Sequence, residues 1–227
     1  MVKISDYLRI TQDCKNIKML YITPELFKEY YQKLEKNERN SLLSHIVIKN
    51  IPFVFKDVPL LFEQIVQYLS TLLNLEHDDI KLIGSAKTGF SVSPKPDYGK
   101  TFSSESDLDF TIINEKLFCT LENEYNSWKD AYRNQLIIPK DSEKYYWDIN
   151  IPHLQKTIAR GFIDTNKIPT RNICPYIQII NNAMYLINVK LKEYHNIVTS
   201  KASTRVYKDY NSFYKQLVLN TDKVLNI

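Results

Sequence analysis

The sequence predicts an α+β protein with α/β-like character, in which a small mixed β-sheet is flanked by helices and followed by a helical C-terminal region. Two apolar runs, at 80–83 and 108–113, have the branched and aromatic composition of buried strands. Long segments around them repeat apolar residues at a spacing of three and four, which indicates amphipathic helices. Glycine is rare, with four in 227 residues, and three of the four lie between positions 84 and 99. Such a chain uses glycine where the backbone turns tightly or approaches a ligand.

The chain before residue 80 is predicted to be helical. Thr23 and Pro24 form a typical helix start, since threonine caps the first turn and proline fits the first helical position. A second helix is expected over 38–49. A third begins near residue 57 and carries a wide apolar face typical of the core. The proline within 51–55 indicates a short extended segment between these two helices.

Two strands and a glycine-bearing loop follow these helices. The run 80–83 ends at Gly84-Ser85, and a short helix is expected directly after Ser85. Residues 86–106 form a loop, and 108–113 is the clearest strand in the sequence. A third strand is expected at 161–164, where the fourth glycine lies.

The remaining segments are predicted as helices, at 115–133, 147–159, 175–198 and from Thr204 to the C-terminus. The expected organisation is therefore a helical extension over 1–56, a core over 57–170 that contains the strands, and a basic helical region over 171–227. The net charge of +4 is unevenly placed along this layout. From Lys156 onward there are eleven Lys and Arg against four Asp and Glu, which suits a polyanionic partner or, alternatively, the solvated faces of surface helices.

Composition also bears on location. No apolar run reaches the roughly 18–20 residues that span a bilayer, so no membrane partner is expected. The N-terminus lacks the basic and then apolar pattern of a signal peptide. Three cysteines without metal-ligand spacing favour a reduced, cytoplasmic protein. Oligomeric state has no signal in the sequence.

The chemistry is expected at Asp107 and Asp109. Alternate residues of a strand point to the same face, so these carboxylates lie about 6–7 Å apart on one side. Such a pair suits Mg²⁺ or Mn²⁺ held together with phosphate oxygens, whereas an isolated Asp-x-Asp is more often a solvated pair or a turn. Gly84, Ser85 and Ser106 are the predicted contacts of a nucleoside triphosphate. The glycine turn would then form the phosphate end of the site and the two carboxylates its metal end.

The combined pattern resembles the DNA polymerase beta-type nucleotidyltransferase superfamily. The matching elements are Gly84-Ser85 after an apolar strand and Ser106-Asp107-Leu108-Asp109-Phe110 on the next strand, and the resemblance covers about residues 58–113. It implies a nucleotidyltransferase core and two-metal transfer of a nucleoside monophosphate from a nucleoside triphosphate to a hydroxyl on RNA, a protein or a nucleotide. The stretch 84–93 is also similar to poorly characterised bacterial members, which implies a defence or toxin–antitoxin context.

The resemblance also implies a third acidic residue on a later strand. Asp164 is the first candidate for this catalytic and metal-binding role, because a predicted strand precedes it, and Asp148 is the second. Each has an alternative interpretation as a helix cap or surface residue. If neither serves, the protein is a catalytically inactive nucleotide-binding or regulatory module of the same fold.

Lysines of the 86–106 loop are further candidates for phosphate contacts. Lys87, Lys95 and Lys100 carry charges that suit phosphate oxygens, and ordinary surface lysines are the alternative. A third interpretation, a plain nucleic-acid-binding protein, depends only on the basic C-terminal part. It predicts binding that weakens steeply with salt and does not require Asp107.

Overall fold

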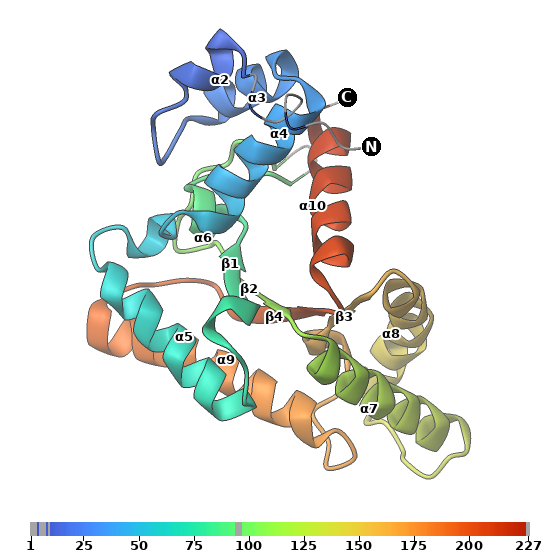
Figure 1. Cartoon of the computed structure of the whole chain (residues 1–227). Helices are drawn as coiled ribbons and strands as arrows, with labels where there is room; N and C mark the ends of the chain where they lie inside the picture. Colours follow the sequence, from blue (N-terminus) through green and yellow to red (C-terminus); the bar gives the residue numbers. More distant parts are fainter. Residues whose placement is uncertain (1–3, 5–7, 9, 94–96, 226–227) are drawn as a thin grey trace.

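Four strands form a single mixed sheet in the computed structural model of the chain, which describes residues 4, 8, 10–93 and 97–225. Their spatial order is β1 (Ile80–Ile83), β2 (Leu108–Ile113), β4 (Ala202–Tyr207) and β3 (Phe162–Asp164) (Figure 1). The strand β2 runs antiparallel to β1 and parallel to β4, and β3 runs antiparallel to β4.

Helices make up most of the remaining structure. Those before β2 are α2 (Gln12–Asn16), α3 (Pro24–Lys33), α4 (Lys36–Leu43), the π-helical segment η1 (Ser44–Lys49), the 3₁₀ turn η2 (Phe53–Phe55), α5 (Pro59–Leu73), the 3₁₀ turn η3 (His77–Asp79) and α6 (Ser85–Thr88). Those after β2 are α7 (Glu115–Arg133), α8 (Asp141–Ala159), the 3₁₀ turn η4 (Thr165–Lys167), α9 (Pro175–His195) and α10 (Tyr210–Leu225). Within the described residues, none of these helices combines the length and hydropathy needed to cross a membrane.

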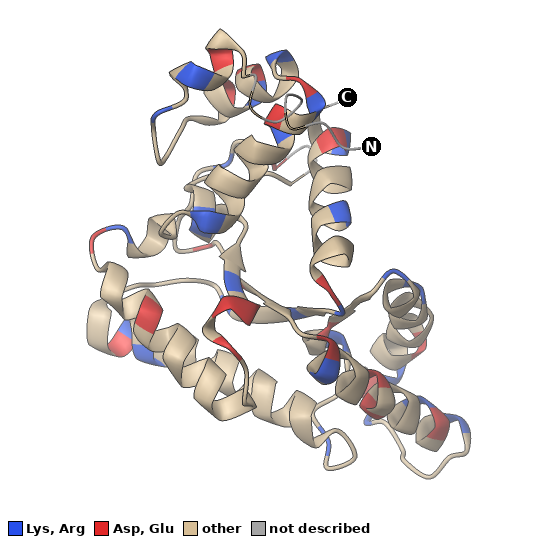
Figure 2. Cartoon of the chain, viewed as in Figure 1, with Lys and Arg blue, Asp and Glu red and all other residues tan. Residues whose placement is uncertain are grey.

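One face of the sheet is apolar and packs against α5, α7 and α9 (Figure 1). Alternate strand residues supply this face, and Leu82, Phe110 and Val206 are at most 1% exposed. Burying side chains of this size contributes roughly 1.5–3 kcal/mol each. Most of α5 and α9 is uncharged (Figure 2), as expected for helices that cover a core.

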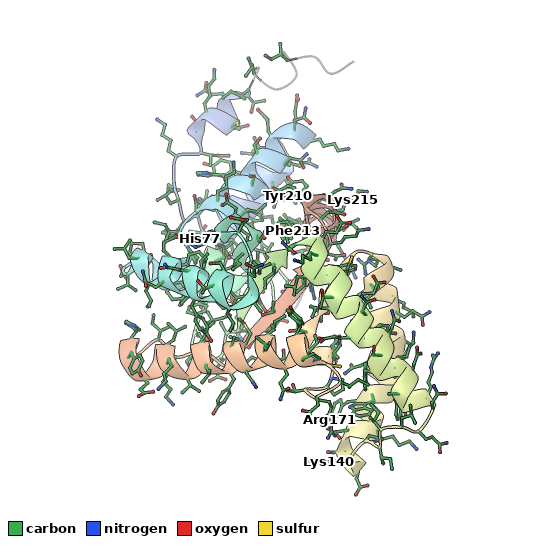
Figure 3. All side chains as sticks on the ribbon, turned by 60° about the horizontal axis from the view of Figure 1, so that its bottom comes forward. His77, Lys140, Arg171, Tyr210, Phe213 and Lys215 are labelled. Atoms are coloured by element: carbon green, nitrogen blue, oxygen red, sulfur yellow. The ribbon has the colours of Figure 1, made fainter. Side chains whose placement is uncertain are left out.

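The opposite face of the sheet is covered by elements from both ends of the chain. The N-terminal helices and α10 stand on this side (Figure 1), and α10 begins beside the sheet at Tyr210 and Phe213, labelled in Figure 3. The Tyr31 hydroxyl donates to Asp222 at 2.8 Å, and the Tyr214 hydroxyl donates to the Asn40 carbonyl at 2.9 Å. These bonds join α3 and α4 to α10, so the two ends of the chain form one roof above the sheet.

Several predicted elements are confirmed. The strands at 80–83 and 108–113 and the helix at 115–133 have the expected bounds. The third strand is present at Phe162–Asp164, and the helix predicted over 38–49 corresponds to α4 and η1. These segments carry strong local signals, such as the Asn114 side chain that caps α7 by accepting from the Leu117 amide at 2.9 Å.

Two predictions are wrong. Residues 202–207 form β4, and the final helix begins only at Tyr210 instead of Thr204. Because β4 lies between β2 and β3, the region over 171–227 is not purely helical, and the predicted core over 57–170 lacks an inner strand of its own sheet. In addition, the expected extended segment at 51–55 contains the 3₁₀ turn η2, which closes with a bond from the Lys56 amide to the Phe53 carbonyl.

Candidate functional site

The glycine turn at the end of β1 lies beside Asp109, the second carboxylate of the acidic pair. Ile83 pairs with Asp109 across the two strands. Gly84 follows with φ +73° and ψ −161°, a conformation that essentially only glycine adopts. A Cβ atom added at Gly84 would lie 2.7 Å from Oδ2 of Asp109. The predicted adjacency of the glycine turn and the acidic pair is therefore confirmed, while the roles assigned to these residues stay predictions.

These residues lie at a cavity of about 460 Å³ between the sheet and its roof. The size falls within the roughly 300–1,000 Å³ of small-molecule sites. The strand residues that line it and face the roof are Ile83, Asp109, Thr111, Asp164, Ser203 and Arg205, and Asp107, directly before β2, lines it as well. Lining residues of the roof include Val47 of η1 and Leu217, Asn220 and Thr221 of α10. The cavity thus has a polar, charged floor and a mostly uncharged roof.

Asp109 is half-buried in the floor of this cavity. Its Oδ1 atom accepts a hydrogen bond from the Ser203 hydroxyl on β4 at 3.1 Å. Burial raises the pKa of the Asp109 carboxyl, and the neighbouring Asp107 raises it further, while the bond from Ser203 and the charges of Arg205 and Lys201 act in the opposite direction. A bound cation would stabilise the ionised form of this carboxyl.

Asp107 is the more exposed member of the acidic pair, with a third of its side chain accessible. Its Oδ2 atom lies 3.5 Å from the Lys201 ammonium. Among the residues that the structure describes, no three His, Cys, Asp or Glu side chains gather as a complete metal site. Two carboxylates with the Ser203 hydroxyl beside them do fit Mg²⁺, which commonly takes one or two carboxylates and completes its shell with substrate phosphate and water.

Asp164 lines the same cavity, and its carboxylate already interacts with two other side chains. Arg205 Nε donates to Oδ1 of Asp164 at 2.6 Å, and Nε2 of His153 lies 3.8 Å from Oδ2. The strand β4 separates Asp164 from Asp109. Asp164, the first candidate for the third carboxylate, therefore lies at the site, but its carboxylate is bonded to Arg205 there. The second candidate, Asp148, is exposed outside the cavity and accepts from the Tyr132 hydroxyl at 2.8 Å.

The predicted phosphate contact of Lys87 disagrees with the structure. Its side chain is 2% exposed, and its ammonium donates to the carbonyl of Ile48 at 2.9 Å and to that of Asn50. Burial and the charge of Lys81 lower the pKa of Lys87 to about 8. The ammonium therefore holds backbone carbonyls instead of facing the cavity.

Other predicted nucleotide contacts do not line the cavity either. Ser85 begins α6, and the Ser106 hydroxyl accepts from the Ser103 amide at 3.0 Å within the loop. Lys100 is exposed elsewhere, and Lys95 lies outside the described residues. Of the predicted nucleotide-binding residues, Gly84 is the one that reaches the cavity within the described part of the chain.

Several cavity residues were not predicted from the sequence. Lys201, Ser203 and Arg205 all belong to β4 or its start, and Lys167 follows β3. The missed signal was the alternation in 202–207, where Ser203 and Arg205 alternate with the β-branched Thr204 and Val206, as is typical of a half-buried strand. One helix from Thr204 to the C-terminus is predicted instead.

No protein-family model, curated protein or solved structure matches this chain.

Proposed function

We propose that the protein is a Mg²⁺-dependent nucleotidyltransferase that moves a nucleoside monophosphate from a nucleoside triphosphate to a hydroxyl acceptor. The observation that supports it best is the position of Gly84 directly beside Asp109, in a cavity that both residues line together with Asp107. The sequence resemblance to polymerase beta-type nucleotidyltransferases rests on the same residues. The acceptor would be RNA, a protein or a nucleotide, and the reduced state of the three cysteines favours the cytoplasm.

The residues of the cavity have two proposed roles. Some hold the metal ion, and the others lie around these ligands. Asp107 and Asp109 would hold Mg²⁺ or Mn²⁺, which supplies Lewis acidity and neutralises charge on the transferred phosphate. Ser203 orients Asp109 through its hydroxyl, and the missing side chain of Gly84 leaves the space in which Oδ2 of that carboxylate lies. Lys201 offers a positive charge next to Asp107.

Charge balance supports a polyphosphate substrate. Three carboxylates line the cavity, and so do the three cations Lys167, Lys201 and Arg205. The lining is therefore close to neutral when all six groups are ionised. One bound divalent cation would give it a net charge of +2, which attracts an anion such as a triphosphate.

The proposal predicts that Asp109→Asn abolishes transfer. We expect incorporation of label from an α-phosphate-labelled nucleoside triphosphate to fall by about 100-fold or more, since even residues that only support metal ligands contribute about 10–100-fold. The fold should persist, because burial disfavours the charged Asp109 and asparagine keeps its shape. Asp148→Asn is the matched control, since that carboxylate lies outside the cavity. Undiminished labelling by folded Asp109→Asn would refute the proposal.

A second candidate function is a nucleotide-binding module without catalytic activity. The observation that favours it is the bond from Arg205 to Asp164, which engages the carboxylate expected to take the third catalytic and metal-binding role. Calorimetry with Mg²⁺ and each nucleoside triphosphate, followed by an assay for pyrophosphate release, separates the two functions. Tight binding without pyrophosphate release, with RNA, protein and nucleotide acceptors all supplied, would favour the module.

A further inference from the structure

We propose that Arg205 forms a second phosphate subsite in this cavity, on the opposite side of Asp109 from Gly84, and that Asp164 is its positioning residue. The reaction that the subsite serves rests on the proposed function, whereas its capacity to bind a phosphate group does not. Two sources could supply that group: the tail of the nucleoside triphosphate, or a phosphate on the acceptor.

Arg205 is held in a fixed orientation by its neighbours. Its Nε atom donates to Asp164 Oδ1 at 2.6 Å, and its guanidinium carbon lies 4.8 Å from the centroid of the Phe162 ring. A guanidinium restrained in this way loses little conformational entropy when it binds an anion.

The same guanidinium keeps donors for a ligand. It has five N–H groups, and the bond from Nε to Asp164 uses one of them. Arg205 lines the cavity, and about a third of its side chain is exposed (34%). Planar N–H pairs of arginine match the oxygens of a phosphate group, which they often bind in a bidentate way.

Thr111 supplies an independent indication of a ligand. It pairs directly with Arg205 across β2 and β4 and points to the same face. Its side chain is fully buried and lines the cavity, yet its hydroxyl has no hydrogen-bond partner within the described part of the chain. A buried hydroxyl without a partner costs roughly 1–3 kcal/mol, and a phosphate oxygen would provide the missing acceptor. Lys167 adds a second cation to this part of the lining.

The subsite lies close to the acidic pair. Ser203, which donates to Asp109, and Arg205 are two positions apart on β4, and such residues are about 6–7 Å apart on one face. Gly84, directly after β1, lies beside Asp109 on the other side. A cation at the acidic pair would thus lie between the glycine turn on one side and the Arg205 subsite on the other.

Calorimetric titration with inorganic pyrophosphate in EDTA tests the subsite without a metal. The wild-type protein should bind pyrophosphate, and Arg205→Gln should bind it roughly 10- to 100-fold more weakly, the effect expected for hydrogen bonds to a charged group. Arg205→Lys keeps a charged partner for Asp164 and should give an intermediate affinity even if Arg205→Gln folds poorly. Arg160→Gln is the matched control, because Arg160 packs on the same Phe162 ring at 5.4 Å but lies outside this cavity.

Asp107→Asn and Asp109→Asn separate this inference from the proposed function. Both variants should bind pyrophosphate in EDTA at least as well as the wild type, because each loses a negative charge. If Arg205→Gln binds pyrophosphate like the wild type, or if the wild type does not bind it, the subsite is refuted even where nucleotidyl transfer is observed. Pyrophosphate binding that depends on Arg205, without any nucleotidyl transfer, would support the subsite and refute the proposed enzymatic activity.

The role of Asp164 is tested by measuring both pyrophosphate binding and the affinity for a metal ion. Asp164→Asn should weaken pyrophosphate binding and leave the affinity for Mn²⁺, followed by electron paramagnetic resonance, unchanged. A fall in Mn²⁺ affinity would make Asp164 a metal ligand and overturn its positioning role. Pyrophosphate titrated in the presence of Mg²⁺ and a non-hydrolysable nucleoside triphosphate identifies the source of the phosphate: competition indicates the donor's tail, and simultaneous binding indicates the acceptor.

Discussion

At the scale of single residues, Gly84 has two constraints that no other residue type satisfies together. Its backbone conformation lies in a region essentially restricted to glycine. Its missing side chain also leaves the space in which Oδ2 of Asp109 lies. A substitution at Gly84 should therefore affect both the stability of the fold and the ligand site. Comparison with a substitution at another glycine separates these two effects.

Gly84→Ala is expected to destabilise the fold and to disrupt the site. The strained backbone should cost roughly 1–3 kcal/mol, which lowers Tm by about 2–4 °C per kcal/mol in a chain of this size. The new methyl group should also displace Asp109 and remove the rise in Tm caused by Mg²⁺ with nucleotide. Scanning calorimetry with and without these ligands measures both effects.

Gly99→Ala is the control for this prediction. Gly99 also has a positive φ, +81°, but the nearest atom to an added Cβ is Cβ of Pro24 at 3.4 Å. It should lower Tm through its backbone and keep the ligand-induced rise. If both variants keep that rise, Gly84 does not shape the ligand site.

At the scale of elements, Lys87 joins α6 to the end of η1. Its ammonium bonds to the carbonyls of Ile48 and Asn50, which the end of the π-helical segment leaves free. The short helix that follows the glycine turn is thereby fixed to an element of the cavity roof. The sequence indicated a charge near a phosphate-binding turn, but not the direction in which that charge points.

The buried Lys87 predicts a specific dependence of stability on pH. Its pKa is about 8 in the folded protein, against 10.5 for an unperturbed lysine. Between these values the unfolded chain binds more protons than the folded one, so the free energy of unfolding rises with pH, by at most about 1.4 kcal/mol per pH unit. Lys87→Met should lack this contribution.

Urea unfolding of both proteins from pH 7 to 10.5 measures this difference, since other titrating groups are common to the two. We expect the wild type to gain stability relative to Lys87→Met above pH 8. Parallel curves across that range would show that Lys87 keeps its proton in the fold.

At the scale of the whole molecule, the sheet is completed only by distant parts of the chain. The strand β4 is hydrogen-bonded to β2 on one side and to β3 on the other. The roof combines N-terminal helices with α10 through contacts such as that of Tyr31 with Asp222. The cavity thus exists only when both ends of the chain are in place.

A fragment of residues 57–170 is therefore expected not to fold. It contains the acidic pair and the glycine turn, but it lacks β4, and the core face of β2 and β3 would lose α9. Circular dichroism should show no cooperative thermal transition for the fragment, in contrast to the full chain. A cooperative transition close to that of the full chain would instead establish 57–170 as an independent domain.

The sequence by itself determined the elements whose signals are local. The strands beside Gly84 and Asp109, the capped helix α7 and the shared face of Asp107 and Asp109 all follow from short-range patterning, capping and the alternation of strand side chains. The adjacency of Gly84 and Asp109 was also predictable, because an apolar strand, a glycine turn and a second strand follow one another closely.

Only the tertiary structure decided what surrounds the acidic pair. Ser203 bonds to Asp109 although the two are 94 positions apart, and Arg205 takes the carboxylate of Asp164 from the neighbouring strand. Such contacts depend on which strands pair and in which register, and those choices are set by the burial of the whole apolar face. The periodicity of one segment carries no information about its partner strand, so the chemistry of β4 emerged only from the assembled sheet.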